Sequence, residues 1–259
     1  MSWRNRWLLD LAGPIVLLAF AFTPAYAGLE DRPLESDEAE TLPPRTVSAS
    51  VGWEYAEEDN GDVEITIPLD ATYGITKHFE LGIQIPVLSL NPEEDDDAAG
   101  VGDIRLRPEH VFLEESRILP SLAWGAIVKF PTGSESEDLG SGRTDYAVEL
   151  LASKSVGPTL GSIHLTHTFV GGDDDVFGPA ANLAYFVNDR LTLVGEWLGE
   201  ISEEKDSLSS LLGFIYEIAD GIALDTGVSF GLINADLDWS VRVGITYEFT
   251  FRTPRAHRR

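Results

Sequence analysis

The stretch WSVRVGITYEFTF, residues 239–251, has an apolar or aromatic side chain at every odd position and a polar, charged or glycine residue at every even one. Successive side chains of a strand point to opposite faces, so this stretch predicts a β-strand with one apolar and one polar face. It is longer than the typical soluble strand of about 5–6 residues and reaches the roughly 9–11 residues that a tilted strand needs to cross a bilayer. Trp239 at one end and Tyr247, Phe249 and Phe251 at the other are typical of the aromatic girdles at the two membrane interfaces.

The same alternation recurs along the chain and predicts twelve strands. They cover residues 47–55, 63–73, 79–87, 102–113, 119–130, 144–153, 159–169, 180–187, 191–201, 207–218, 222–232 and 239–251. Short turns alternate with longer, acidic connections, as in outer-membrane barrels with short periplasmic turns and longer extracellular loops. We therefore expect an all-β fold, a single antiparallel up-and-down transmembrane barrel of about twelve strands over residues 45–251. An even number of strands places the N-terminus and the C-terminus of the barrel on the same side, the periplasmic one.

Charge decides which face of the strands is outside. A soluble barrel keeps its apolar face inside, whereas a membrane barrel turns it toward lipid. One face of the twelve strands is almost free of charge, with only His110 and His167 interrupting it. The opposite face, which we expect to line the lumen, carries Glu64, Asp70, Glu80, Asp103, Arg105, Arg107, Glu109, Lys129, Asp145, Glu149, Glu196, Asp225, Arg242 and Glu248. Together with the export signal described next, this asymmetry favours a membrane barrel.

Three segments lie outside the predicted strands. Residues 1–27 have a short basic region, an apolar run and a final Ala-Tyr-Ala, which together predict a cleaved signal peptide. Residues 28–44 are acidic and aperiodic, and predict a disordered periplasmic tail, with a plug folded into the lumen as the alternative. Residues 252–259, RTPRAHRR, predict a basic periplasmic tail, with contact to an acidic partner or lipid headgroups as the alternative.

Composition excludes several functions. The chain has no cysteine, so it can form neither a disulfide nor a thiolate metal site. A formal net charge of −26 argues against nucleic acid as a partner, because nucleic acids require a basic surface. Acidic loops could bind calcium through their oxygens, but their spacing matches no calcium-loop motif, and solvated charge is the simpler interpretation. We expect no cofactor and no specific metal site.

Three stretches carry a family resemblance: GVGDIRLRPEHVFLEE (residues 100–115), LPSLAWGAIVKFPTG (119–133) and LGSGRTDYAVELLASKSVG (139–157). They resemble the bacterial outer-membrane β-barrel family of transporters linked to the phenol-degradation meta pathway. The family's motifs fall on Gly100, Gly102 and Asp103, on Lys129, Pro131, Thr132 and Gly133, and on Leu139, Gly140, Ser141, Gly142 and Asp145. The resemblance implies an outer-membrane channel in a Gram-negative bacterium, with hydrophobic or aromatic compounds as a substrate class.

The resemblance also implies partners. Barrels of this kind end on an aromatic residue that the assembly machinery reads, and Tyr247, Phe249 and Phe251 fit that role although eight residues follow them. Outer-membrane lipid and lipopolysaccharide are the expected surroundings, and a small-molecule solute the expected cargo.

The predicted function is that of a passive channel or transporter for small molecules. The alternative is a closed structural or adhesion barrel whose acidic loops bind cations or surface partners. Membrane lipases carry a serine and a histidine on the outer face, whereas Ser162 and His164 share the predicted inner face, and no oxyanion donor can be named. We therefore expect no enzymatic activity.

Overall fold

A computed structural model of the chain describes residues 33–91, 97–171, 175–203 and 205–251. The predicted signal peptide, the first residues of the acidic segment 28–44 and the basic tail 252–259 lie outside the described residues, as do parts of three acidic connections. Among the described residues, no helix is long and apolar enough to cross a membrane.

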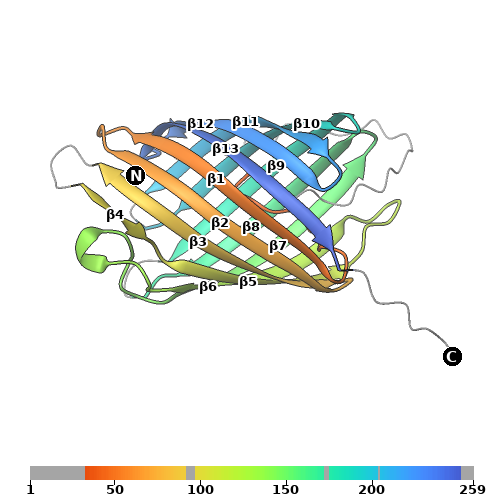
Figure 1. Ribbon diagram of the computed structural model, residues 1–259, viewed down its shortest axis with the longest axis horizontal. Coiled ribbons are helices and arrows are strands. Elements are labelled where there is room, and N and C mark those ends of the chain that lie inside the picture. Colours follow the sequence, from red (N-terminus) through yellow and green to blue (C-terminus); the bar gives the residue numbers. More distant parts are fainter. Residues whose placement is uncertain (1–32, 92–96, 172–174, 204, 252–259) are drawn as a thin grey trace, which may run out of the picture.

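Almost all of the described chain forms β-strands (Figure 1). The strands are β1 (Thr46–Glu58), β2 (Val63–Thr76), β3 (Phe79–Asn91), β4 (Ala98–Val101), β5 (Ile104–Leu113), β6 (Ser121–Phe130), β7 (Asp145–Val156), β8 (Thr159–Phe169), β9 (Val176–Asn188), β10 (Leu191–Ile201), β11 (Asp206–Ala219), β12 (Ile222–Ile233) and β13 (Leu237–Thr250). A single turn of 3₁₀ helix, η1 (Glu135–Glu137), lies between β6 and β7.

Strand pairing closes the sheet into a barrel. Except for β4 and β5, each strand pairs antiparallel with its neighbours in the sequence, and β1 pairs with β13 from Thr46↔Thr250 to Glu57↔Trp239. Both β4 and β5 pair with β3, so they are two parts of one wall strand, and the barrel has twelve strands. The predicted fold class is confirmed.

The break between β4 and β5 differs from the prediction, which began a strand at Gly102. Gly102 and Asp103 leave the ladder, and the Gly102 amide donates to the Pro86 carbonyl at 2.9 Å. Before this break, toward the long-loop end, Ala98–Val101 forms β4, which lies outside the predicted strands. Asp103 leaves the ladder because its carboxylate accepts hydrogen bonds from the connection between β6 and β7.

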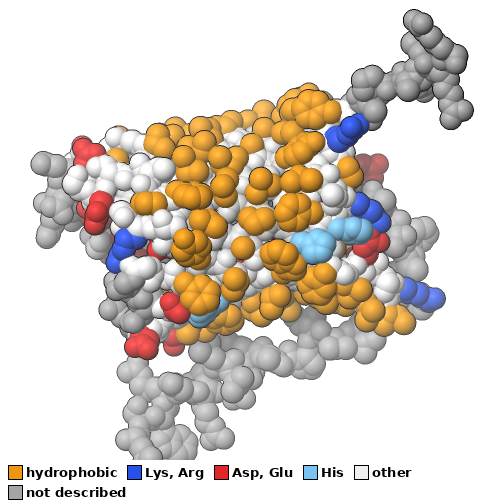
Figure 2. All heavy atoms as spheres, turned by 90° about the horizontal axis from the view of Figure 1, so that it is seen from below, with side chains coloured by type: hydrophobic (Ala, Val, Ile, Leu, Met, Phe, Trp, Pro, Cys, Tyr) orange, Lys and Arg blue, Asp and Glu red, His pale blue; other side chains and the backbone are white. Residues whose placement is uncertain are grey.

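The alternating side chains sort onto the two faces as a membrane barrel requires. On β7, Tyr146, Val148 and Leu150 point outward with more than half of each side chain exposed, while Asp145 and Glu149 are buried on the inner face. Figure 2 shows apolar side chains covering the middle of the wall and charged side chains gathered toward its two ends. The barrel therefore presents an apolar belt to its surroundings and polar groups to its interior.

The two ends of the barrel differ. At one end, the short-turn end, the strands are joined by residues 77–78, 114–120, 157–158, 189–190 and 220–221, and there β1 starts and β13 ends. At the other, the long-loop end, most connections are longer, and the longest is residues 131–144. This asymmetry matches the predicted alternation of turns and loops.

Candidate functional site

The lumen is not empty, because residues 33–44 run through it. We call residues 33–42 the lumenal segment. It begins beside Arg242 near the middle of the wall and leads to the short-turn end, where the Arg45 amide donates to the Gly74 carbonyl at 2.7 Å. Gly74 makes room for this passage, since a Cβ there would lie 2.3 Å from the Pro43 carbonyl oxygen. These residues belong to the segment expected as an acidic tail or a plug.

Apolar side chains hold the lumenal segment at two places. Leu34 packs among Leu160, Val194, Leu211 and Ile215, an apolar patch on the inner face of β8 to β12. Ala39 is fully buried against Val111, Ala123 and Leu151, on the inner face of β5 to β7. Burying a leucine side chain contributes about 1.5–3 kcal/mol. The segment thus covers apolar surface that would otherwise face a polar lumen.

Glu196 on β10 is the main acceptor for the segment's backbone. Its carboxylate accepts hydrogen bonds from the amides of Glu35 at 3.0 Å and Ser36 at 2.8 Å, and from the Ser36 hydroxyl. Glu196 is only 1% exposed. Charged hydrogen bonds in such buried surroundings are stronger than neutral ones.

Arg242 on β13 binds the start of the segment. Its guanidinium donates to the Pro33 carbonyl at 3.2 Å, and to the carboxylates of Glu35 and Glu54 at 2.6 Å each. One buried cation therefore joins the segment to the wall strand β1. Glu54 stands at an inward position of its strand, so alternation could have identified it, although sequence reasoning left it out.

Arg107 on β5 forms a second charge cluster around the segment. Its guanidinium pairs with Asp37 of the segment, and with Glu109 and Glu149 of the wall at 2.8 Å each. His164 completes the cluster: its Nδ1 accepts from the Asp37 amide at 3.3 Å, so its Nε2 carries the proton that it donates to Glu149 at 2.9 Å.

Asp37, Glu149 and His164 bring potential metal-ligand atoms within 4.8 Å of one another. Arg107 already pairs with both carboxylates, so its charge takes the place that a metal cation would occupy. The cluster binds Asp37 of the lumenal segment through Arg107 and His164, and this binding accounts for its arrangement without a metal.

Further contacts fix the segment toward the short-turn end. The Ala39 amide donates to Ser153 Oγ at 2.7 Å, and the Ala39 carbonyl accepts from Ser121 Oγ at 2.6 Å. The Leu42 amide donates to Glu80 at 2.6 Å, and Thr41 Oγ1 donates to the Lys77 carbonyl at 3.0 Å. Polar side chains of the wall thus satisfy backbone groups of an irregular segment, as buried backbone requires.

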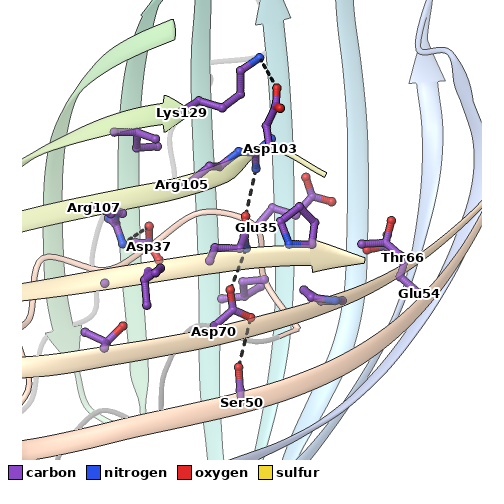
Figure 3. Close-up of a pocket in the computed structure, with 18 of the residues that line it drawn as sticks. Glu35, Asp37, Ser50, Glu54, Thr66, Asp70, Asp103, Arg105, Arg107 and Lys129 are labelled. Atoms are coloured by element: carbon purple, nitrogen blue, oxygen red, sulfur yellow. Dashed lines mark hydrogen bonds and ion pairs between the residues drawn. The ribbon is translucent and has the colours of Figure 1, made fainter. Parts of the chain in front are cut away.

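Beside the lumenal segment a cavity of about 970 Å³ remains (Figure 3), lined by residues from Leu42 and Glu80 near the short-turn end to Glu64 near the long-loop end. On one side of it a hydrogen-bonded row crosses four strands: Ser50 donates to Asp70 at 3.3 Å, Gln84 donates to Asp70 at 2.9 Å, and Arg105 donates to Gln84 at 3.1 Å. Glu64 accepts from Thr66 at 2.6 Å on the same side. Pro86, Leu88, Ile127 and Leu139 supply apolar lining.

The structure places the predicted lumen residues as follows. Nine line this cavity: Glu64, Asp70, Glu80, Asp103, Arg105, Arg107, Lys129, Glu149 and Arg242. Glu109, Asp145, Glu196 and Asp225 are buried, and Glu248 is half-buried near the short-turn end. Glu35, Asp37, Glu38 and Glu40 also line the cavity, and sequence reasoning missed them because an aperiodic segment gives no sign of where it lies. Ser162 and His164 lie inside, hydrogen-bonded to Ser153 and Glu149.

No protein-family model matches the sequence, and no curated protein matches it. Solved structures match the fold. An outer membrane channel from Pseudomonas putida F1 superposes with a TM-score of 0.72 over 83% of this chain and 100% of that chain, at 14% sequence identity. The NanC porin gives 0.57 over 78% and 98%, at 11% identity. The KdgM porin, in complex with disordered oligogalacturonate, gives 0.54 over 77% and 99%, at 12% identity.

The chain therefore has the fold of outer-membrane channels and porins. A closed barrel with an apolar belt and a polar interior satisfies every backbone group inside a bilayer, which few other folds can do. The expected localisation in a Gram-negative outer membrane is confirmed on this basis.

Replacing Glu196 should release the lumenal segment. Glu196→Ala removes the acceptor of three hydrogen bonds, so hydrogen exchange at the Glu35 and Ser36 amides should accelerate by at least about tenfold. Glu64→Ala is the matched control, because Glu64 is a lumen carboxylate bonded to Thr66 of the wall. Equal exchange in the two variants would show that Glu196 does not hold the segment.

Binding of the lumenal segment inside the lumen should weaken as pH rises. Burial, together with the neighbouring Glu40 and Asp37 carboxylates, raises the pKa of Glu38 from 4.5 to about 8. The seated segment thus binds this proton more tightly than a released one. The resulting stabilisation is complete below pH 4.5 and is lost as pH rises to about 8.

Protease cleavage within residues 33–42 tests this, measured at pH 5 and pH 8.5 and normalised to a free peptide of the same sequence. Cleavage should be faster at the higher pH in the native protein, and Glu38→Gln should reduce that difference. A native protein cleaved equally at both values would contradict the expectation.

Proposed function

We propose that the protein is a passive outer-membrane channel for small solutes, closed at rest by its own lumenal segment. The observation that carries this proposal is the cavity of about 970 Å³ inside a closed barrel with the fold of known channels. The segment that borders this cavity is held by side-chain hydrogen bonds and ion pairs rather than by strand pairing. Its displacement would leave the barrel intact, so the segment acts as a plug.

Charge supports a preference for cations. Eleven acidic and four basic side chains line the cavity, and the acidic side chains remain in the majority even with Glu38 protonated at neutral pH. Arg107, Lys129 and Arg242 are paired with carboxylates, and Arg105 donates to Gln84. The remaining field is negative, and acidic linings favour cations in pores. Glu64, near the long-loop end, is well placed to meet an entering ion.

The substrate class and the partners are finer proposals. Hydrophobic or aromatic solutes, and the link to phenol degradation, rest on the family resemblance, and the apolar lining by Pro86, Leu88, Ile127 and Leu139 supports them. Recognition by the barrel-assembly machinery through Tyr247, Phe249 and Phe251 is consistent with their place on the last strand and directly after it. A second candidate function is a closed structural barrel. The position of the lumenal segment inside the lumen favours it.

Single-channel recording in planar bilayers separates these candidates. The mature chain should show brief openings, and a variant lacking residues 28–44 should conduct steadily, because the segment no longer occupies the lumen. Under a KCl gradient the reversal potential should show cation preference, and Glu64→Lys should reduce it.

Absence of conductance in both the mature chain and the deletion variant would exclude the channel and support the closed barrel. Steady conductance of equal size in both would keep the channel and exclude the plug. A reversal potential unchanged by Glu64→Lys would remove this carboxylate from selectivity.

A further inference from the structure

A second element narrows the lumen at the long-loop end. We call residues 131–144, between β6 and β7, the inner loop. Asp138, Leu139, Gly140 and Ser141 of this loop line the same cavity as the lumenal segment. Leu139 is only 3% exposed, and its amide donates to the Ser134 carbonyl at 3.0 Å. The inner loop therefore folds into the mouth of the barrel rather than away from it.

One carboxylate holds both ends of the inner loop. Asp103 Oδ1 accepts from the Gly133 amide at 3.0 Å, near the start of the loop. Asp103 Oδ2 accepts from the Ser141 amide at 2.9 Å and the Ser141 hydroxyl at 3.2 Å, near its end. Asp103 is 7% exposed, and Lys129 lies 3.5 Å away. Removing the carboxylate would leave the Gly133 amide, the Ser141 amide and the Ser141 hydroxyl without this acceptor.

The inner loop approaches Asp103 closely, and a second residue ties it to the wall. A Cβ on Gly140 would lie 2.3 Å from Asp103 Oδ1, so a glycine is required for the loop to approach this carboxylate. Thr132 Oγ1 accepts from the Ile104 amide at 2.9 Å and donates to the Gly102 carbonyl at 2.8 Å, which ties the loop to the break between β4 and β5. The break in the wall and the inward loop are thus one structural unit.

Asp145, at the start of β7, provides a natural comparison. It is a buried carboxylate at the same end of the barrel, and it also pairs with Lys129. Its backbone donor, however, is the Gly171 amide at 3.1 Å, in the connection between β8 and β9. The two carboxylates share a cation and differ in the backbone amides that they accept from, although Arg143 of the inner loop also interacts with the Asp145 carboxylate.

We propose that Asp103 is the positioning residue that keeps the inner loop folded across the mouth of the barrel, and that this loop sets the upper size limit of solutes entering the lumen. The size limit rests on the proposed channel function, whereas the hold of Asp103 on the loop does not. The two parts can therefore be tested by separate measurements on the full mature chain.

Hydrogen exchange tests the hold without any need for conduction. In Asp103→Ala, the Gly133 and Ser141 amides should exchange about tenfold faster or more, because their acceptor is lost. Asp145→Ala should accelerate Gly171 instead. Asp103→Asn, which keeps one acceptor oxygen, should fall between native and Asp103→Ala. Unchanged exchange at Gly133 and Ser141 in Asp103→Ala overturns the proposal.

Solute exclusion tests the consequence. Neutral polyethylene glycols of graded size are added to the bilayer chamber, and the largest one that still lowers the conductance gives the size limit. Asp103→Ala should admit larger polymers than the native protein, and Asp145→Ala should not. Faster exchange with an unchanged size limit overturns the role of the loop in size selection. Silence of all variants overturns the channel function, while the exchange data still decide the hold.

Discussion

The structure depends on the pairing of β1 with β13. A bilayer offers no hydrogen bonds to a strand edge, so a sheet crosses it only when its first and last strands meet. The pairing runs along β1 from Thr46 to Glu57. Closure then fixes the rest: the apolar face of each strand turns to lipid, and the polar face turns to an enclosed interior.

Closing the barrel encloses charged side chains of the wall, and the lumenal segment supplies carboxylates that pair with two of them. Arg242 is buried and Arg107 is partly buried, and each cation binds one carboxylate of the segment together with wall carboxylates. Removing one partner from such a group is costly, because the other charge stays buried. Leu34 and Ala39 add apolar burial. The segment is thus bound by side-chain contacts of the wall rather than by strand pairing.

Much of the barrel could be predicted from the sequence, because the alternation of apolar and polar residues that identifies a strand lies within that strand. Alternation over residues 239–251 reports directly on the two environments that the strand separates, and the same holds for the other eleven strands. The fold class follows from that pattern. Where the pattern weakens, the prediction was wrong: it assigned Gly102 to a strand and left Ala98–Val101 outside the strands. The break at Asp103 depends on donors some 30 residues later in the chain, which local alternation does not reveal.

The candidate site was less predictable, for the same physical reason. Inward charges such as Glu196 and Arg242 follow from strand parity, but their partners Ser36 and Glu35 lie in a segment without periodicity. Nor does parity show that Leu160 and Leu211 form an inner apolar patch that Leu34 covers. Asp103, Gly133 and Ser141, which carried the family resemblance, meet in space, but the spacing of these residues along the chain did not indicate that Asp103 binds both ends of a loop.

In the proposed function, movement of the lumenal segment opens the channel. The chain has no cysteine, so a single pair can be introduced at Ser36 and Asn182, whose side chains lie 3.0 Å apart across the segment and β9. Single-channel recording then compares the pair joined by a reducible thiol cross-linker with the same protein after reduction. We predict that openings disappear in the cross-linked protein and return on reduction. Openings of equal size and frequency in both states would contradict the account.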